Sequence, residues 1–405
     1  MVAWLAALLS GPAFLLGTLG PGIGPLLHGT SLPAVQAIRH VKVAPTSPGR
    51  PLFNDPTGTL AQQYRLVRHV TRMVDGTPRG ATIHVAAFSF SLPPVAGALI
   101  AAEHRGVHVK MVVDDHSRTW PAVRRVVGAL GTQVRRDSFV RICHATCRGG
   151  RGNQHAKFMT ISRTRGMSDV VLVGAMNYTN YAAREQWNDL YTVSDANLYQ
   201  EFTREFRLMT LDRPQGRLTF RSAGRGLDTE VSPLPGWRPA NDPVVRRLSR
   251  VRCTGAAFGA GRDGRTVIRI EMHGWNGPRG VLLAHRIAGL ERRGCDIRVL
   301  YGVGMGGAAA KAMRAAGVPV VSSAYHHRHT HEKLMLLSGR YGHQRDANLV
   351  WTGSHNWSNR SLVNDEITLQ VSGRSTVEAY LRNFRSVWRL AAVSQGMQKN
   401  LHSPR

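Results

Sequence analysis

Two histidine–lysine pairs recur in this chain, 176 positions apart, at residues 155 and 331. One copy reads QHAKFMTI over 154–161 and the other THEKLMLL over 330–337, so each places a His two residues before a Lys and an apolar run after it. Each copy later reaches a Gly and an Asn, in GAMN (174–177) and GSHN (353–356). Imidazole titrates near neutrality, and Lys and Asn donate hydrogen bonds to anions. The combination is suited to phosphoryl transfer, in which phosphorus is attacked, a leaving oxygen is protonated and the equatorial oxygens are held.

The His-x-Lys spacing predicts where these side chains point. Side chains alternate along a strand, so residues i and i+2 share one face. We expect His155 with Lys157, and His331 with Lys333, to project into a common cleft, with Ala156 and Glu332 pointing away. Two His in one pocket can divide the chemistry, one attacking while neutral and the other donating while protonated.

The elements that must position these pairs follow one order in both halves of the chain. In the first half the pattern predicts a strand, a helix ending in Gly, a strand and a further helix, at 81–90, 95–106, 107–115 and 122–131. In the second half the same elements fall at 266–275, 279–294, 295–304 and 308–317. Each half then reaches its His-x-Lys strand and a strand that closes on the Asn, at 169–177 and 347–356. Such order is typical of βαβ units. We infer an internal duplication whose halves face each other across one site.

A duplicated H-x-K followed by G-[AS]-x-N resembles the phospholipase D superfamily, whose members carry two HKD motifs. The resemblance covers most of residues 50–390. It implies an α/β fold of two pseudo-symmetric α/β/α sandwich halves with mixed, largely parallel sheets and an active site at their interface. It also implies that one motif His attacks phosphorus to give a phosphohistidine, that the other acts as general acid, and that neither a metal nor another cofactor is needed.

The resemblance carries over to individual residues. It implies phosphate-binding Lys and Asn residues and one catalytic His in each half: His155, Lys157 and Asn177, then His331, Lys333 and Asn356. By family habit His155 is the expected nucleophile and His331 the acid. Ser354 in GSHN is expected to add a substrate-binding hydroxyl.

The family further orients each His with a carboxylate from the opposite half. Asp189 and Asp365 are the predicted pair because each follows an Asn, at Asn188 and Asn364. Glu366 is the alternative to Asp365.

The chain departs from the family pattern at two kinds of position. The family Asp five residues after the Lys is replaced by Ser162 and Ser338, and Ala175 stands where the family usually has Ser. The Asp is mainly structural in the family, so its absence weakens the match to the motif more than the chemistry. Ala175 lacks a hydrogen-bonding group that the second copy retains in Ser354.

The charge of the chain indicates an anionic partner. Lys and Arg outnumber Asp and Glu by 53 to 25, a formal charge of +28, which attracts nucleic acid, acidic headgroups or phosphate esters. An Arg-rich proteome would have the same composition, so charge alone does not select the partner. A phospholipid or membrane-surface substrate is favoured, with Trp187, Trp275 and Trp357 placed to meet a lipid interface. The alternatives are a nuclease of the same superfamily acting on DNA or RNA, and a non-catalytic binder of anionic surfaces.

The N-terminal segment and the cysteines predict export. Residues 1–27 carry no charged side chain and resemble the apolar core of a secretory signal, and PAVQA (33–37) suits cleavage near Ala37. We therefore expect a signal peptide over 1–37 and a secreted protein, with an uncleaved anchor as the alternative because the basic n-region is missing. An even cysteine count with one pair in each half predicts two disulfides, Cys143 with Cys147 and Cys253 with Cys295. A zinc site lacks an evident fourth ligand.

Length and composition predict two core-forming halves in one monomeric chain of 405 residues. The expected boundaries are 50–211 for the first half, 212–245 for a Gly-, Pro- and Arg-rich linker, 246–392 for the second half and 393–405 for a tail. No G-x-S-x-G elbow occurs, which argues against a serine esterase of the α/β-hydrolase type.

Overall fold

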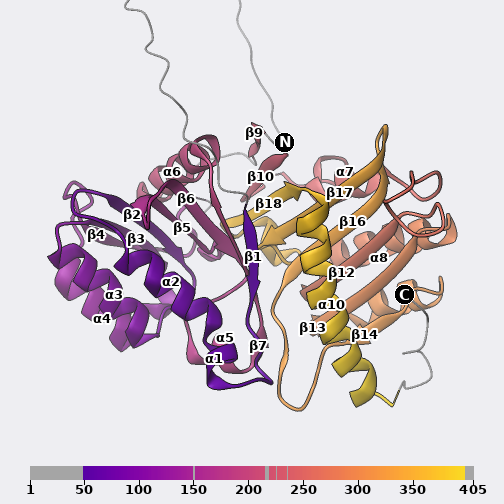
Figure 1. Cartoon of the computed structure of the whole chain (residues 1–405), viewed down its shortest axis with the longest axis horizontal. Helices are drawn as coiled ribbons and strands as arrows, with labels where there is room; N and C mark the ends of the chain where they lie inside the picture. The colour runs from indigo at the N-terminus through magenta and orange to yellow at the C-terminus, as the bar shows by residue number, and fades with distance from the viewer. Residues whose placement is uncertain (1–48, 149–150, 215–218, 225, 235, 397–405) are drawn as a thin grey trace, which may run out of the picture. The chain divides into compact units, whose positions relative to one another are not determined.

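The computed structural model describes residues 49–148, 151–214, 219–224, 226–234 and 236–396 (Figure 1). The predicted signal segment 1–37 and residues 397–405 of the predicted tail lie outside these ranges. The described residues fall within one compact unit, Ala44–Arg405, which contains both His-x-Lys copies.

The first half is built on a seven-stranded sheet with the order β1-β8-β6-β5-β2-β3-β4. Its strands are β1 (Arg50–Phe53), β2 (Thr82–Ala87), β3 (His108–Asp114), β4 (Phe139–Cys143), β5 (Phe158–Thr164), β6 (Met167–Gly174) and β8 (Asp189–Ser194). Its main helices are α2 (Arg65–Asp75), α3 (Pro93–His104), α4 (Pro121–Leu130) and α6 (Ala196–Thr210), and two short ones are α1 (Leu60–Gln63) and α5 (Asn180–Arg184). The expected β-α-β-α order is confirmed, with boundaries shifted by a few residues.

The second half repeats this plan on a nine-stranded sheet, whose main path is β14-β13-β12-β16-β17-β18-β10-β9 with β11 beside β16. The strands are β9 (Thr219–Gly224), β10 (Leu227–Ser232), β11 (Val251–Arg252), β12 (Val267–Trp275), β13 (Asp296–Met305), β14 (Val320–Ser322), β16 (Lys333–Tyr341), β17 (Gln344–Gly353) and β18 (Glu366–Ser372). The helices are α7 (Pro243–Ser249), α8 (Gly277–Arg292), α9 (Gly307–Arg314) and α10 (Arg374–Ser394). The segment 212–245, expected to be a linker, thus contributes β9 and β10 to the edge of this sheet.

Side-chain alternation divides the core into layers. Along β16, Met335 and Leu337 pack with the cluster under α8, whereas Leu334 and Leu336 pack on the opposite face. That opposite cluster also contains Phe158 from the first half, so a single apolar core joins the inner faces of the two sheets. The first half is layered in the same way, with α2, α3 and α4 on one face of its sheet and α6 on the other (Figure 1).

Both sheets are mixed, as expected, but parallel pairing is confined to one edge of each. Strands β2, β3 and β4 are parallel neighbours, and so are β12, β13 and β14. The remaining ladders of both sheets are antiparallel, including β5 with β6 and β16 with β17. The expectation of largely parallel sheets therefore holds only for the βαβ part, because tight turns such as Arg165–Gly166 join antiparallel strands directly.

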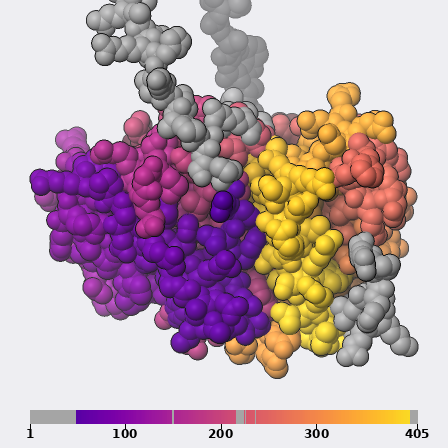
Figure 2. All heavy atoms as spheres, viewed as in Figure 1, coloured from indigo at the N-terminus to yellow at the C-terminus, as the bar shows by residue number. Residues whose placement is uncertain are grey.

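Helix α10 lies along the boundary between the halves. It contacts β16, β17 and β1, and Figure 2 shows its surface beside the N-terminal segment of the first half. A second link is the short parallel pair of β7 (Gln186–Trp187) with β15 (His329–Thr330). None of the helices in the described ranges combines the length and the apolar character needed to cross a bilayer.

The glycines of the two G-x-x-N motifs permit a close strand crossing. A Cβ on Gly174 would lie 2.2 Å from the carbonyl oxygen of Asp189, and a Cβ on Gly353 would lie 2.2 Å from that of Ile367. Each motif Gly therefore lets the strand that ends at the Asn lie against the strand that follows. The shared requirement explains why both copies keep Gly at this position.

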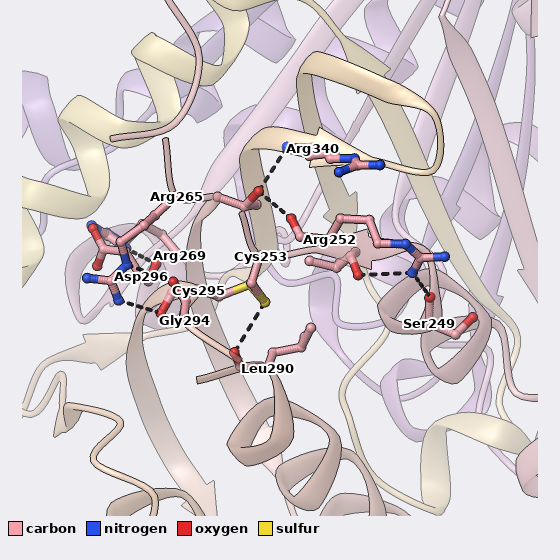
Figure 3. Close-up of a disulfide and its surroundings, with 12 residues drawn as sticks. Ser249, Arg252, Cys253, Arg265, Arg269, Leu290, Gly294, Cys295, Asp296 and Arg340 are labelled. Carbon is pink, nitrogen blue, oxygen red and sulfur yellow. Dashed lines mark hydrogen bonds and ion pairs between the residues drawn. A yellow bond between two sulfur atoms is a disulfide. The ribbon is translucent and has the colours of Figure 1, made fainter. Parts of the chain in front are cut away.

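Both predicted disulfides are present. Cys143, the last residue of β4, pairs with Cys147, and Cys253 pairs with Cys295 just before β13. Arginines surround the second bond (Figure 3), and Arg265 donates to the carbonyl oxygens of Gly294 and Cys295 at 2.7 and 3.0 Å. Since all four cysteines are used in this way, the zinc alternative is wrong.

Candidate active site

Each His-x-Lys pair lies immediately before or at the start of an inner strand. Lys157 directly precedes β5 and Lys333 begins β16, so each His sits in the loop leading into its strand. The ammonium of each Lys folds back on the carbonyl oxygen of its own His, with Nζ···O distances of 2.6 and 2.7 Å. Lys333 Nζ also lies 3.0 Å from Nε2 of His331. The i, i+2 spacing thus places each His and Lys on one face, as expected.

The two halves hold each other's histidines. The backbone N–H of His155 donates to the carbonyl oxygen of Asp365 at 3.0 Å, and that of His331 donates to Trp187 at 2.9 Å. The rings are held in the same exchanged way: His155 Nδ1 lies 2.8 Å from Glu366 Oε2, and His331 Nδ1 lies 3.0 Å from Asn188 Oδ1. With Nδ1–H donating in both cases, Nε2 of His155 is left for chemistry, and Nε2 of His331 lies against Lys333 Nζ.

The orienting side chains are therefore not the predicted pair. Asp365 presents its backbone to His155, while its carboxylate accepts from the N–H of Cys147 at 2.6 Å. Asp189 Oδ2 accepts from Tyr380 at 2.8 Å and from the hydroxyl of Thr352, away from His331. Because strand side chains alternate, the residue after each carbonyl contact faces the ring, which is Glu366 in one half and Asn188 in the other. The Asn-Asp dipeptide that the two halves share therefore suggested an alignment of the halves that differs from the structural one by two residues.

A difference between the two half-sites follows. His155 faces a carboxylate, and His331 faces a neutral amide. The ring packed against each imidazole differs too: Phe88 lies 4.7 Å from His155, and His273 lies 4.6 Å from His331, centroid to centroid. Neither Phe88 nor His273 was predicted. The signal available was their common position near the ends of β2 and β12, the first strand of the βαβ unit in each half.

The predicted phosphate-binding amides lie where β6 and β17 end, and both are half-buried. Asn356 Oδ1 accepts from the N–H of Gly274 at 2.9 Å, which leaves its NH₂ group as a donor. Asn177 Oδ1 is buried and has no hydrogen-bond partner among the described residues. Ser354, expected to bind substrate, is instead fully buried, and its hydroxyl accepts from the backbone N–H of Ile367 at 3.0 Å.

The predicted interfacial tryptophans are not at the surface. Trp187, Trp275 and Trp357 are 3%, 0% and 2% exposed. The rings of Trp275 and Trp357 pack edge to face at 4.5 Å inside the second half. Their expected role at a lipid interface is wrong, because their apolar rings complete the core.

Burial and mutual repulsion set the protonation of the four basic groups. Burial lowers the pKa of His155 to about 4, against the opposing pull of Glu366. Burial also lowers the pKa of Lys157 to about 7, and it lowers those of His331 and Lys333 further below their usual values. The charge of Lys157 contributes to the lowered pKa of Lys333, so charges from the two halves act within one site. A bound phosphate anion would reverse these shifts.

Glu366 is the carboxylate that the site keeps ionised. Burial alone would raise its pKa, but the charge of His155 and their hydrogen bond lower it to about 2. Asn364 adds a donor, its Nδ2 lying 3.1 Å from the other oxygen of Glu366. At neutral pH a fixed negative charge therefore faces Nδ1 of His155.

Three buried carboxyl groups lie behind the second half-site. They are Asp189, Glu271 and Glu332, all 0% exposed. Burial and the charge of Asp189 raise the pKa of Glu271 to about 8, and burial with Glu271 raises that of Glu332 well above its usual value. Glu332 points away from the site, as predicted, and accepts from Asn383 at 2.9 Å. Ala86, Ala156 and Ile367 fill the equivalent places in the other half-site, so the fold itself does not require acids here.

Comparison with known families agrees with this geometry. The family model described as "Cardiolipin synthase, PLD-like domain" matches residues 79–210 and 268–388, more than half of the chain and one segment in each half. The chain belongs to the phospholipase D-like family. A comparison with curated protein sequences found no match.

Two solved structures that align over 84% of the chain share its fold. A phosphatidylserine synthase from Haemophilus influenzae Rd KW20 superposes with a TM-score of 0.55 at 12% identity, over 84% of this chain and 86% of that one. A polyphosphate kinase from Porphyromonas gingivalis gives a TM-score of 0.55 at 15% identity, over 84% of this chain but only 50% of the kinase. Nuc from Salmonella typhimurium, a phospholipase D family member, matches 40% of this chain and 93% of its own at 20% identity, with a TM-score of 0.29. Membership of this phospholipase D-like family makes the chain a phosphodiesterase-type protein.

Proposed function

We propose that the protein is a phospholipase D-type enzyme that cleaves the headgroup-side ester of glycerophospholipids, by hydrolysis or by transfer to an alcohol. The observation that carries this proposal is the exchange of partners between the two His-x-Lys pairs, which places two oriented imidazoles and two ammonium groups in one site. Such a site supplies a nucleophile, an acid and cationic donors for a single phosphodiester.

In the proposed reaction His155 is the nucleophile. Its Nε2 lone pair attacks phosphorus, the P–O bond to the leaving alcohol breaks, and His331 donates a proton to that oxygen. Glu366 supports this assignment, because its carboxylate stabilises the positive charge that Nδ1–H carries in the phosphoimidazolium. In the second step water or an alcohol gives its proton to His331 and attacks phosphorus, which releases His155. Lys157, Lys333, Asn177 and Asn356 hold the phosphoryl oxygens throughout.

The test is release of free choline from phosphatidylcholine vesicles by the purified protein. We expect turnover that His155→Ala and His331→Ala each abolish, and an acid-labile phosphoryl group on His155 when His331→Ala is mixed with substrate. Absence of choline release, together with normal thermal unfolding, would rule out phosphatidylcholine as the substrate. A phosphoryl group found on His331 when His155→Ala is mixed with substrate would instead reverse the two roles.

The +28 charge favours one second candidate, a nuclease of the same family. Nicking of supercoiled plasmid in the presence of EDTA, with steep loss of activity on raising salt, would select it. If neither substrate is turned over and His155→Ala binds anionic vesicles as wild type does, the protein is a binder of anionic surfaces.

Export is part of the proposal. Two disulfides in one chain suit an oxidising compartment, and the apolar N-terminal segment suits a signal peptide. Mass spectrometry of protein recovered from culture medium should find an N-terminus close to residue 38.

A further inference from the structure

Beside the main site a serine, a histidine and an aspartate are linked by hydrogen bonds in that order. His116 Nδ1 is 2.5 Å from Asp114 Oδ1, and His116 Nε2 is 3.1 Å from Ser89 Oγ. A nucleophile within reach of a base that is itself oriented by a third group is the geometric signature of an activated serine. The phosphodiesterase proposal assigns no role to these three residues.

The fold fixes their positions at the carboxyl ends of two parallel neighbours. Ala87 at the end of β2 lies opposite Val113 of β3, so Ser89 and Asp114 leave the same edge of the sheet. Asp114 is fully buried, and its second oxygen accepts from the backbone N–H of Gln154 at 2.7 Å. Asp114 also accepts from the N–H of His116, which fixes the short turn that carries the imidazole. In open α/β sheets this edge is where reactive groups gather.

The assignment of each hydrogen atom in this network to a donor identifies the serine hydroxyl that His116 can deprotonate. With Nδ1–H donating to Asp114, Nε2 of His116 is a bare acceptor. Two hydroxyls lie 3.1 Å from it, those of Ser89 and Ser117. Ser117 donates its proton to the carbonyl oxygen of Phe88 at 3.1 Å, so the hydroxyl that donates to Nε2 is that of Ser89.

The solvent exposure of the two serines also favours Ser89 over Ser117. Ser117 is fully buried, Ser89 is half-buried, and the side chain of His116 is 32% exposed. The imidazole of His116 packs on Phe88 at 4.2 Å and meets Trp120 edge-on at 5.3 Å, which gives the serine an apolar wall. A substrate can therefore reach Ser89 along a surface suited to acyl chains.

We propose that Ser89, His116 and Asp114 form a second catalytic site that hydrolyses carboxylic acyl esters. Ser89 Oγ attacks the carbonyl carbon while its proton passes to His116 Nε2. The tetrahedral adduct then expels the alcohol, which takes that proton, and leaves an acyl-serine. Water gives a proton to His116 and attacks the acyl carbon, so that a carboxylic acid leaves and Ser89 regains its proton.

Ser89 lies beside the phosphodiesterase site. Lys157 Nζ lies 5.0 Å from the ring centroid of Phe88, the residue before Ser89. Asn177 precedes Tyr178, whose N–H donates to the carbonyl oxygen of Ser89 at 3.0 Å. A glycerophospholipid carries its acyl esters on the carbons next to the phosphate-bearing carbon, so one bound lipid presents both kinds of bond. This activity does not depend on the phosphodiesterase proposal, because a simple ester needs only the serine site.

The experiment labels the full-length protein with a fluorophosphonate probe, maps the modified residue by mass spectrometry, and measures hydrolysis of 4-nitrophenyl butyrate. We expect the label on Ser89 and a loss of ester turnover of about 10³-fold or more in Ser89→Ala and His116→Gln. Ser91→Ala is the matched control, since Ser91 is half-buried in the same loop, and it should be labelled and active as wild type.

Thermal unfolding of each variant separates loss of chemistry from loss of fold. A label only on residues other than Ser89, or ester turnover that survives in a folded Ser89→Ala, would overturn the proposal. Choline release measured in parallel keeps the two activities distinct. Ser89 labelling without choline release supports the serine site alone, and choline release without Ser89 labelling supports the phosphodiesterase alone.

Discussion

Glu366 Oε2 lies 2.8 Å from Nδ1 of His155, although the two residues are 211 positions apart and come from opposite halves. Within the described ranges no equivalent carboxylate contacts the ring of His331, which faces Asn188 instead. The two histidines, alike in the sequence, therefore meet different electrostatic surroundings, and the first prediction measures that difference.

Replacing Glu366 with Gln should lower kcat by about 10²–10⁴-fold, the range of a general acid–base contribution, because the amide cannot stabilise charge on the imidazole. Asn188→Asp is the reciprocal change, and we expect it to raise the pH at which activity falls. Asp365→Asn serves as control, since its carboxylate contacts the Cys147 N–H and not the ring, and it should cost less than about tenfold. Equal losses in Glu366→Gln and Asp365→Asn would contradict the assignment.

The pH profile of kcat/KM should be bell-shaped with its maximum on the acid side of neutrality. Activity rises as His155 loses its proton, through a pKa that burial lowers to about 4. It falls as His331, whose pKa burial lowers well below 6.5, loses the proton that it donates, and it falls further as Lys157 loses the charge that holds phosphate, through a pKa lowered to about 7. Bound substrate raises the pKa of these cationic groups, so the falling limb of kcat should lie at higher pH than that of kcat/KM. A profile that is flat between pH 5 and 9 would count against the paired histidines.

Glu271 should make the fold less stable as pH rises. Burial raises its pKa in the folded chain from an ordinary 4.5 to about 8, so between these values the folded state binds the extra proton. The contribution of Glu271 to the free energy of unfolding is fully present below about pH 4.5 and is lost as the pH rises through 8. Glu271→Gln removes this loss, and its Tm should exceed that of wild type by about 5 °C or more at pH 8.5 but match it near pH 5. A Tm difference that does not change with pH would disprove the effect.

Gly174→Ala should destabilise the protein by more than about 2 kcal/mol, because the new Cβ would lie 2.2 Å from the carbonyl oxygen of Asp189. Gly128→Ala is the matched control. Gly128 is an exposed glycine of α4 with open space around it, and alanine there should add about 0.5–1 kcal/mol of helix stability. Urea unfolding of both variants measures the change in the free energy of unfolding, which should decrease in Gly174→Ala and increase in Gly128→Ala. An unchanged free energy of unfolding in Gly174→Ala would disprove the close approach.

The two disulfides should differ in their contributions to stability. Cys253 and Cys295 are 42 positions apart, whereas Cys143 and Cys147 are only four apart. Closing the longer loop restricts the unfolded chain more, so the Cys253→Ser/Cys295→Ser variant should lose about 4 kcal/mol and the Cys143→Ser/Cys147→Ser variant about 2 kcal/mol. Chemical unfolding without reductant compares them. A larger loss from the short loop would show that native-state contacts, such as that of Cys147 with Asp365, dominate.

The duplicated frame was predictable because hydrophobic periodicity and the turn glycines are local signals. The H-x-K and G-x-x-N positions were predictable because spacing fixes which face of a strand a side chain occupies. The side chains that orient the histidines could not be predicted in this way. Glu366 and Asn188 occupy equivalent strand positions but differ in residue type, and the Asn-Asp dipeptide that the two halves share makes other contacts. Burial of Trp275 and Trp357 was also hidden, because an aromatic residue near a motif fits a core as well as an interface.

Each imidazole is oriented by a residue from the opposite half, so neither half-site is complete until both halves have been synthesised. A nascent chain that has emerged only as far as β8 possesses His155, Lys157 and Asn177 but lacks the carboxylate that orients the first ring. Under the proposed mechanism the first half-site is complete only when β18 is in place. A chain that ends before β18 is therefore expected to lack the oriented His155 on which the proposed reaction depends.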